Sequence, residues 1–181
     1  MSLPEILVGL AIMALLAAVV LPTVAGQILK GDATRVIEDL EAVRSGIEQF
    51  VADIHRYPGK YNDLSTPITT TVAQYSDIFG NAYTAGMVPK WKGPYVTKDT
   101  VTTSGVTNSV APTGFGASLL RPFMRVTNTN GVEYVTIIAT PISGPDFDKV
   151  DERFDGVINR TGGQLRWVSP DTLKFLALPI Q

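Results

Sequence analysis

MSLPEILVGLAIMALLAAVVLPTVAGQILK, residues 1–30, is the stretch that decides the fold of this chain. No charged side chain occurs from Ile6 to Leu29. Such a run is long enough to cross the hydrocarbon core of a bilayer, which takes about 20 helical residues. We interpret residues 1–30 as a helix that is apolar all round, and therefore buried in lipid or in a bundle of other helices.

Glu5 is the unusual residue of this segment. A secretory signal peptide is the alternative interpretation, but it requires a basic leading region, and here that region holds a carboxylate and no Lys or Arg. A carboxylate at the edge of an apolar helix is costly to desolvate and usually has a partner and a function. Lys30 and Arg35 lie about 40 Å away along a helix that rises ~1.5 Å per residue. The nearest cation is therefore the α-amine of Met1, in the same chain or in another copy.

Glu5, the apolar stretch after it, Pro22 and a polar amphipathic helix beyond resemble the mature N-terminus of a type IV pilin or of a type II secretion pseudopilin. The resemblance implies that a prepilin peptidase removes a short leader and N-methylates Met1. It also implies that Met1 and Glu5 of neighbouring subunits pair during assembly. Two positions depart from the family pattern: Met1 stands where Phe is usual, and Pro4 replaces an apolar residue, which the first turn of a helix tolerates.

Pro22 and Gly26 predict a break in the helix. Proline removes one backbone hydrogen bond, and each glycine, including Gly31, weakens a helix by roughly 1 kcal/mol relative to Ala. In filaments of the family the region around the matching proline is often unwound. We therefore expect local melting between about Pro22 and Gly31 in the filament.

An amphipathic helix is expected next, and Tyr57-Pro58-Gly59 ends it. Apolar residues recur there at spacings of three and four, which predicts a stripe packed on a sheet; they are Val36, Ile37, Leu40, Val43, Ile47, Phe50, Val51 and Ile54.

Strands are indicated at 123–127, 132–140, 164–169 and 173–178, with a hairpin turn at Asn130-Gly131. Strands after a long helix predict an α+β head at residues 31–181 with an antiparallel sheet, the pilin fold that the resemblance implies.

Residues 61–118 are rich in Thr, Ser, Gly, Pro and Asn, which is typical of long surface loops with short strands. Arg56-Tyr57-Pro58 and, later, Trp91-Lys92-Gly93-Pro94-Tyr95 resemble the pattern of major pseudopilins, in which an RYP segment precedes a W-x-G-P-Y segment. These two segments favour a pseudopilin, whereas the long Thr-rich loops favour a surface pilus.

An acidic cluster lies between the second and third expected strands. Carboxylates in a Gly-containing loop supply the oxygen ligands that Ca²⁺ prefers, and the alternative is a solvated acidic loop. Major pseudopilins carry a calcium site in a C-terminal loop, so the resemblance favours the ion. The candidate ligands are Asp146, Asp148, Asp151 and Asp155.

Composition excludes several classes of function. With no Cys among 181 residues, disulfides, thiol catalysis and cysteine metal sites are excluded. The net charge of −2 does not support bulk attraction to nucleic acid. No Gly-x-Ser-x-Gly, P-loop or dinucleotide motif occurs, so we expect no enzyme. His55 has neither Cys nor a second His with which to share a metal, and Trp91 and Trp167 are expected to be core or interface anchors.

The sequence therefore predicts a homo-oligomeric filament subunit. Residues 1–25 would hold it in the inner membrane until an assembly platform lifts it out, with a secretin implied by the family. The leading interpretation is the major subunit of an extracellular type IV pilus, serving adhesion, motility or DNA uptake. The alternative is the major pseudopilin of a type II secretion system. A membrane-anchored enzyme lacks its catalytic residues here, and Glu5 argues against a monomeric membrane-anchored binding domain.

Overall fold

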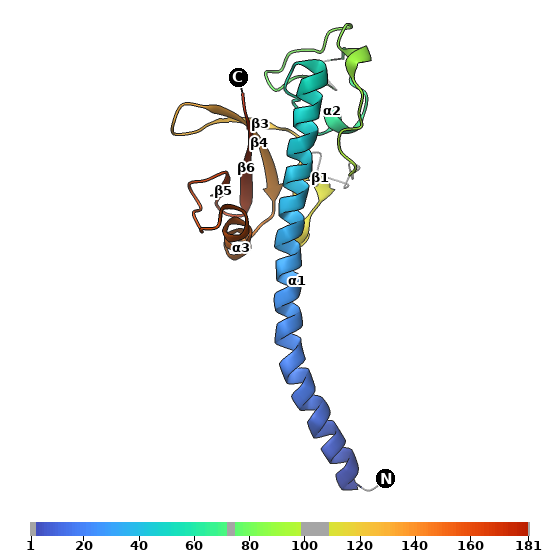
Figure 1. Cartoon of the computed structure of the whole chain (residues 1–181), viewed down its shortest axis with the longest axis vertical. Coiled ribbons are helices and arrows are strands. Elements are labelled where there is room, and N and C mark those ends of the chain that lie inside the picture. Colours follow the sequence, from blue (N-terminus) through green and yellow to red (C-terminus); the bar gives the residue numbers. More distant parts are fainter. Residues whose placement is uncertain (1–2, 72–74, 99–108, 181) are drawn as a thin grey trace.

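The computed structural model describes residues 3–71, 75–98 and 109–180. One long helix, α1 (Leu3–Ile54), runs the length of the molecule. Its C-terminal half packs against the head, and its N-terminal half extends beyond the head (Figure 1).

The C-terminal half of α1 is held by its apolar stripe. Val36, Leu40, Ile47 and Phe50 have no exposed surface, and Val43 and Ile54 are almost as deeply buried. Ile37 and Val51 lie half-buried beside them. The spacing of three and four residues keeps these side chains on one face, so the predicted amphipathic helix is confirmed.

The helix does not break at Pro22 or Gly26 in the single chain, because α1 continues through both positions. One proline costs a helix about 3 kcal/mol, but the helical turns on both sides keep most of the backbone hydrogen-bonded. The break expected from the sequence is therefore absent from the single chain, and melting within a filament stays a prediction.

Six antiparallel strands form the sheet, in the order β1-β2-β4-β6-β5, with β3 also paired to β4. The hairpin of β3 and β4 turns through Asn128 and Gly131, as the sequence predicted. The third and fourth predicted strands are β5 and β6. The strand bounds are β1 Ser109–Pro112, β2 Ser118–Leu120, β3 Met124–Thr127, β4 Glu133–Thr140, β5 Leu165–Val168 and β6 Thr172–Pro179.

The core lies between α1 and one face of this sheet. Val135, Ile137 and Phe175 on that face are fully buried together with the stripe of α1. Helix α3 (Gly144–Asp155) covers the same face beside α1. Its Phe154 ring meets the ring of Phe175 at a centroid distance of 5.5 Å. The α+β class with an antiparallel sheet is therefore confirmed.

Helix α3 corrects the expectation of an acidic loop. Ser143 caps its first turn by accepting a hydrogen bond from the N–H of Asp146, and Gly156 ends it in the left-handed conformation (φ 77°). Phe147 and Val150 are buried at helical spacing. The carboxylates therefore lie on a helix whose apolar face enters the core.

Between α1 and β3 the chain is mostly irregular. It contains a short helix, α2 (Asn62–Ser65), and two single turns of 3-10 helix, Val88–Lys90 and Gly114–Gly116. The short strands expected in this region include β1 and β2, which form one edge of the sheet. Most of the Thr-rich run at 97–109 lies outside the described residues.

Candidate functional site

The N-terminal half of α1 carries an unusual exposed apolar surface. Large apolar side chains there are half or more exposed, and they follow one another around the helix. They are Ile6 (50%), Leu7 (58%), Val8 (59%), Leu10 (59%), Ile12 (53%), Met13 (69%), Leu15 (69%) and Leu16 (62%). Monomeric soluble proteins rarely expose such a contiguous patch, and larger patches mark binding surfaces.

The assembly pair Met1 and Glu5 is not placed by the structure. The backbone of Glu5 lies in α1, but its side chain and all of Met1 lie outside the described part of the chain. Their pairing between subunits stays a prediction.

In the part of the chain that the structure describes, no helix combines enough length with enough apolar character to span a membrane.

Both aromatic segments identified in the sequence lie at the C-terminal end of α1, where Asp53 accepts hydrogen bonds from Lys92 and Tyr95 and Arg56 comes soon after the last residue of the helix. Trp91 donates its indole N–H to the backbone oxygen of Asp63 (2.8 Å), and the N–H of Tyr95 donates to the oxygen of Leu64 (2.8 Å). The rings of Trp91 and Tyr95 meet edge to face at 5.6 Å. The W-x-G-P-Y segment is thus hydrogen-bonded to the backbone of the short helix α2.

The RYP segment is held in place by an ion pair with an aspartate from a later loop. Arg56 forms an ion pair with Asp77 (2.6 Å between Nη1 and Oδ2), whose side chain is 1% exposed. The other oxygen of Asp77 accepts the backbone N–H groups of Phe79 and Asn81. An Arg next to an aromatic and a proline is therefore used here to close a loop.

Asp63 is the buried centre of this region. Its side chain has no exposed surface, and Oδ2 accepts hydrogen bonds from Gly59 N (3.0 Å), Lys60 N (3.2 Å) and the hydroxyl of Tyr83 (2.9 Å). Burial raises the pKa of Asp63 to about 6, against the lowering effect of these three donors. The carboxyl group joins the turn after α1 to the loop that carries Tyr83.

The four aspartates considered as calcium ligands point to different partners. Asp146 pairs with Lys149 (2.8 Å). Asp148 accepts two hydrogen bonds from Arg160 (2.6 and 2.7 Å), which hold the pKa of Asp148 below the usual range. Asp151 is fully buried and accepts the N–H of Asn159 (2.6 Å). Asp155 accepts the N–H of Gln164 (3.2 Å).

A four-aspartate calcium site does not form in this arrangement. Among the described residues, no three Asp, Glu, His or Cys side chains come close enough together to share a metal ion. Asp146 and Asp148 are already neutralised by cations. One observation still fits an ion: Oδ1 of Asp151 is buried without a hydrogen-bond partner. Burial raises the pKa of Asp151, and the nearby negative charge of Asp155 raises it further. Calcium binding stays a prediction, now based on Asp151 and Asp155.

We expect calcium to raise the melting temperature of the head if it binds at Asp151. A ligand that binds only the folded state adds about 2.7 kcal/mol at a hundredfold excess over its Kd. Melting curves of residues 31–181 with calcium and with chelator test this. Asp151→Asn should remove the difference, and Asp146→Asn, whose carboxylate is paired with Lys149, should keep it. Superimposed curves for the unchanged head would exclude the site.

The structure also places the histidine and the two tryptophans considered in the sequence. His55 is exposed just after α1, with φ 58°. Trp91 and Trp167 pack partly buried against the core, as anchors. The polar residues that sequence analysis missed are Asp63, Asp77 and Tyr83. The sequence held no signal for their burial, because Asp63 and Asp77 lie in polar loop sequence, where a carboxylate is normally solvated.

A curated protein matches part of the chain. The type II secretion system core protein G of Klebsiella michiganensis is 35% identical to it over 68 residues, which are 38% of this chain and 48% of that protein. The match thus spans about half the length of the relative. No family model matches the chain, and no solved structure matches it significantly. The identity supports the resemblance to the pilin and pseudopilin family, and it does not distinguish one kind of subunit from another.

Proposed function

We propose that this chain is a structural subunit of a helical filament of the pilin and pseudopilin family, with the pilin fold and without catalytic activity. One observation carries the proposal: α1 is committed to the head by its C-terminal half and exposes large apolar side chains throughout residues 6–16. Fully burying one such side chain contributes about 1.5–3 kcal/mol. Eight of them therefore provide a strong driving force for a bundle with other copies.

The head is built to stand outside such a bundle. Among the residues whose burial the structure describes, the core begins at Ala33 and lies within 31–181. Residues 1–30 are left for association, as filament core after assembly and, we propose, as inner-membrane anchor before it. We propose Met1 as the processed and methylated residue and Glu5 as its partner in the neighbouring subunit.

For the type of filament, we propose the major pseudopilin of a type II secretion system. The relative is by its name a core protein of that system, and the chain carries the RYP and W-x-G-P-Y segments that resemble the pattern of major pseudopilins. The extracellular type IV pilus is the second candidate, favoured by the Thr-rich loops. Either assignment implies a prepilin peptidase, an inner-membrane assembly platform and a secretin as partners.

We expect the full chain to form filaments with its assembly platform, and residues 31–181 to form none. Glu5→Ala should lower the filament count sharply while the protein stays membrane-bound, because the α-amine of the neighbour loses its counter-charge. Electron microscopy of sheared fibres and membrane fractionation measure both quantities.

Glu38→Ala is the matched control, since Glu38 is an exposed carboxylate on the same helix. Normal filament yield from Glu5→Ala would disprove the pairing, and a full chain that forms no filaments would disprove the function. Restored protein export in a strain without its own major pseudopilin indicates a pseudopilin, whereas long surface fibres without export indicate a pilus.

A further inference from the structure

Two adjacent aliphatic side chains protrude from the head into solvent. Val157 is 69% exposed and Ile158 51% exposed, in the loop 156–164 that joins α3 to β5. Two adjacent aliphatic residues are a small apolar surface, which a partner can cover. We call Val157 and Ile158 the apolar tip.

The loop that carries the apolar tip is fixed at several points. Asp151 holds the N–H of Asn159, and Asp155 holds the N–H of Gln164. Arg160 is bound by Asp148 through two hydrogen bonds and lies over the ring of Trp167 at 4.9 Å. The acidic residues of α3 therefore hold the loop in one conformation. Such a loop loses little conformational entropy when it binds a partner.

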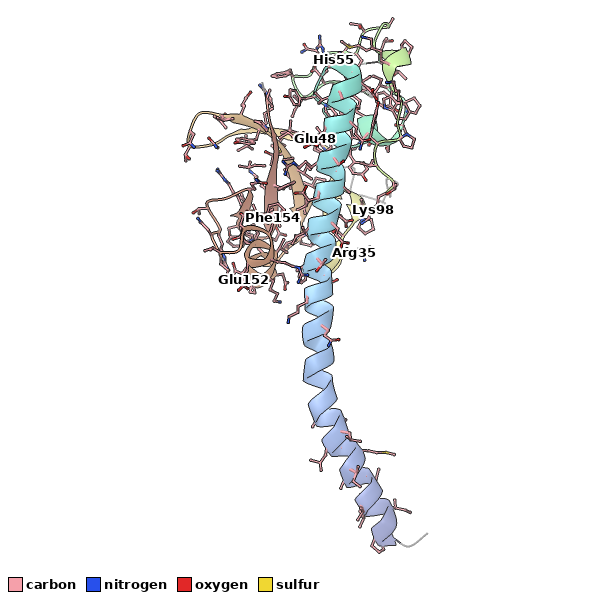
Figure 2. The ribbon with its side chains drawn as sticks, viewed as in Figure 1. Arg35, Glu48, His55, Lys98, Glu152 and Phe154 are labelled. Carbon is pink, nitrogen blue, oxygen red and sulfur yellow. The ribbon has the colours of Figure 1, made fainter. Side chains whose placement is uncertain are left out.

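An open groove of about 240 Å³ lies elsewhere on the head, between the end of α1 and the end of β6. We call it the α1–β6 groove. Helix α3 is at the end of the head from which the N-terminal half of α1 extends, and the end of β6 is at the opposite end (Figure 1). Figure 2 labels Glu48 on the upper part of α1 and, lower in the same view, Phe154 and Glu152 at α3. The groove is lined by Glu48, Val51, Tyr57, Leu178 and Pro179.

One charged residue at each surface has the opposite sign to the other: Glu48 at the groove and Arg153 near the apolar tip. Glu48, at the groove, has a side chain that is 52% exposed, and its ion pair with Arg44 (3.4 Å) is a surface contact. Surface pairs of this kind contribute about 0–1 kcal/mol, so Glu48 exchanges partners at little cost. Arg153, one turn before Val157, is exposed, and the ion pairs found among the described residues do not include it.

We propose that the apolar tip of one copy inserts into the α1–β6 groove of a second copy along the filament, with Arg153 facing Glu48 of that copy. This inference rests on the proposed filament function, in which parallel helices place one end of a head towards the opposite end of another. A contact between two different surfaces of identical chains can repeat from copy to copy, and it builds an open filament when its rotation does not close into a ring. A small contact is sufficient, because the helix bundle already holds the copies at high effective concentration.

The absence of cysteine from the chain permits a cross-linking test without background. Filaments are assembled from the full chain carrying Ile158→Cys and Glu48→Cys, and are treated with a short bis-maleimide. We expect a ladder of covalent multimers on a denaturing gel, and dimers only when the two cysteines are on separate co-assembled copies. The control keeps Glu48→Cys and replaces Ile158→Cys by Val168→Cys, at an aliphatic residue on β5 that is 41% exposed. This control should give at least tenfold less cross-linked product.

The test separates the inference from the function on which it rests. A second variant, Val157→Ser with Ile158→Ser, should lower filament yield severalfold and leave the melting temperature of the head unchanged. Filaments in normal number with no ladder from the 48/158 pair, or with equal ladders from the control, would overturn the tip-in-groove contact and leave the filament function standing. No filaments from the unmodified full chain would overturn both.

Discussion

Replacing Phe50 by Ala is expected to lower the free energy of unfolding of the head by about 3–5 kcal/mol. The Phe50 ring is fully buried and meets two tyrosine rings edge to face, Tyr83 at 5.9 Å and Tyr95 at 5.7 Å. These two tyrosines belong to the loops that close over the end of α1. Removing the ring therefore opens a cavity and also loosens the contact between helix and loops.

Denaturant unfolding of residues 31–181 measures this loss. Leu40→Ala, at another fully buried stripe position, should cost about 2–5 kcal/mol. Gln49→Ala is the control, because Gln49 is exposed on the opposite face of the same helix, and such changes usually stay within about 0.5 kcal/mol. Unchanged stability for Phe50→Ala and Leu40→Ala would mean that the stripe serves contacts between subunits and not the core of the head.

The second large effect is a dependence of stability on pH that originates at Asp63. The folded-state pKa of about 6 lies above the ordinary value of 3.8. Between these values, falling pH protonates Asp63 in the folded head before it protonates the unfolded chain. The folded state is therefore favoured as pH falls from about 6 to 4, by up to about 3 kcal/mol, since one pKa unit corresponds to about 1.4 kcal/mol. Above pH 6 this contribution is absent.

Asp63→Asn isolates the effect, because Asn keeps an oxygen acceptor but does not titrate. The difference in unfolding free energy between the unchanged head and this variant, measured from pH 4 to pH 7.5, should change by about 3 kcal/mol. Asp53→Asn is a control, because the pH dependence of stability that Asp53 contributes has the opposite sign. Hydrogen bonds from Lys92 and then Tyr95 lower the pKa of Asp53, so its contribution is lost as pH falls. A difference that is independent of pH for Asp63→Asn would show that the carboxyl group is not effectively desolvated.

Patterns that repeat along the chain identified most of the regular structure. The stripe from Val36 to Ile54 indicated which face of α1 is buried, because helical spacing alone puts these residues on one side. Asn130-Gly131 located the β3–β4 hairpin, because the turn conformation depends on the turn residues themselves. Helix α3 had its own local signals, Ser143 as cap and Phe147 and Val150 at helical spacing, but its four aspartates suggested a loop.

The candidate sites depended far more on tertiary structure. Asp63 and Asp77 lie in polar loop sequence, and their burial follows from how Tyr83 and Arg56 reach them across the fold. The aspartates of α3 are close in sequence, and Asp148, Asp151 and Asp155 lie on one side of the helix at spacings of three and four. Each aspartate nevertheless has its own partner, which the fold brings to it: Asp146 contacts Lys149, Asp148 contacts Arg160, and the other two accept backbone N–H groups.

By itself, the sequence determined the α+β class and the buried face of α1, because apolar runs and periodicity are local properties; it also predicted that residues 1–30 are an apolar association segment. Only the tertiary structure decided which carboxylates are buried, which are neutralised and which surfaces stay uncovered. Those outcomes depend on contacts between residues far apart in the chain, such as Trp91 with Asp63.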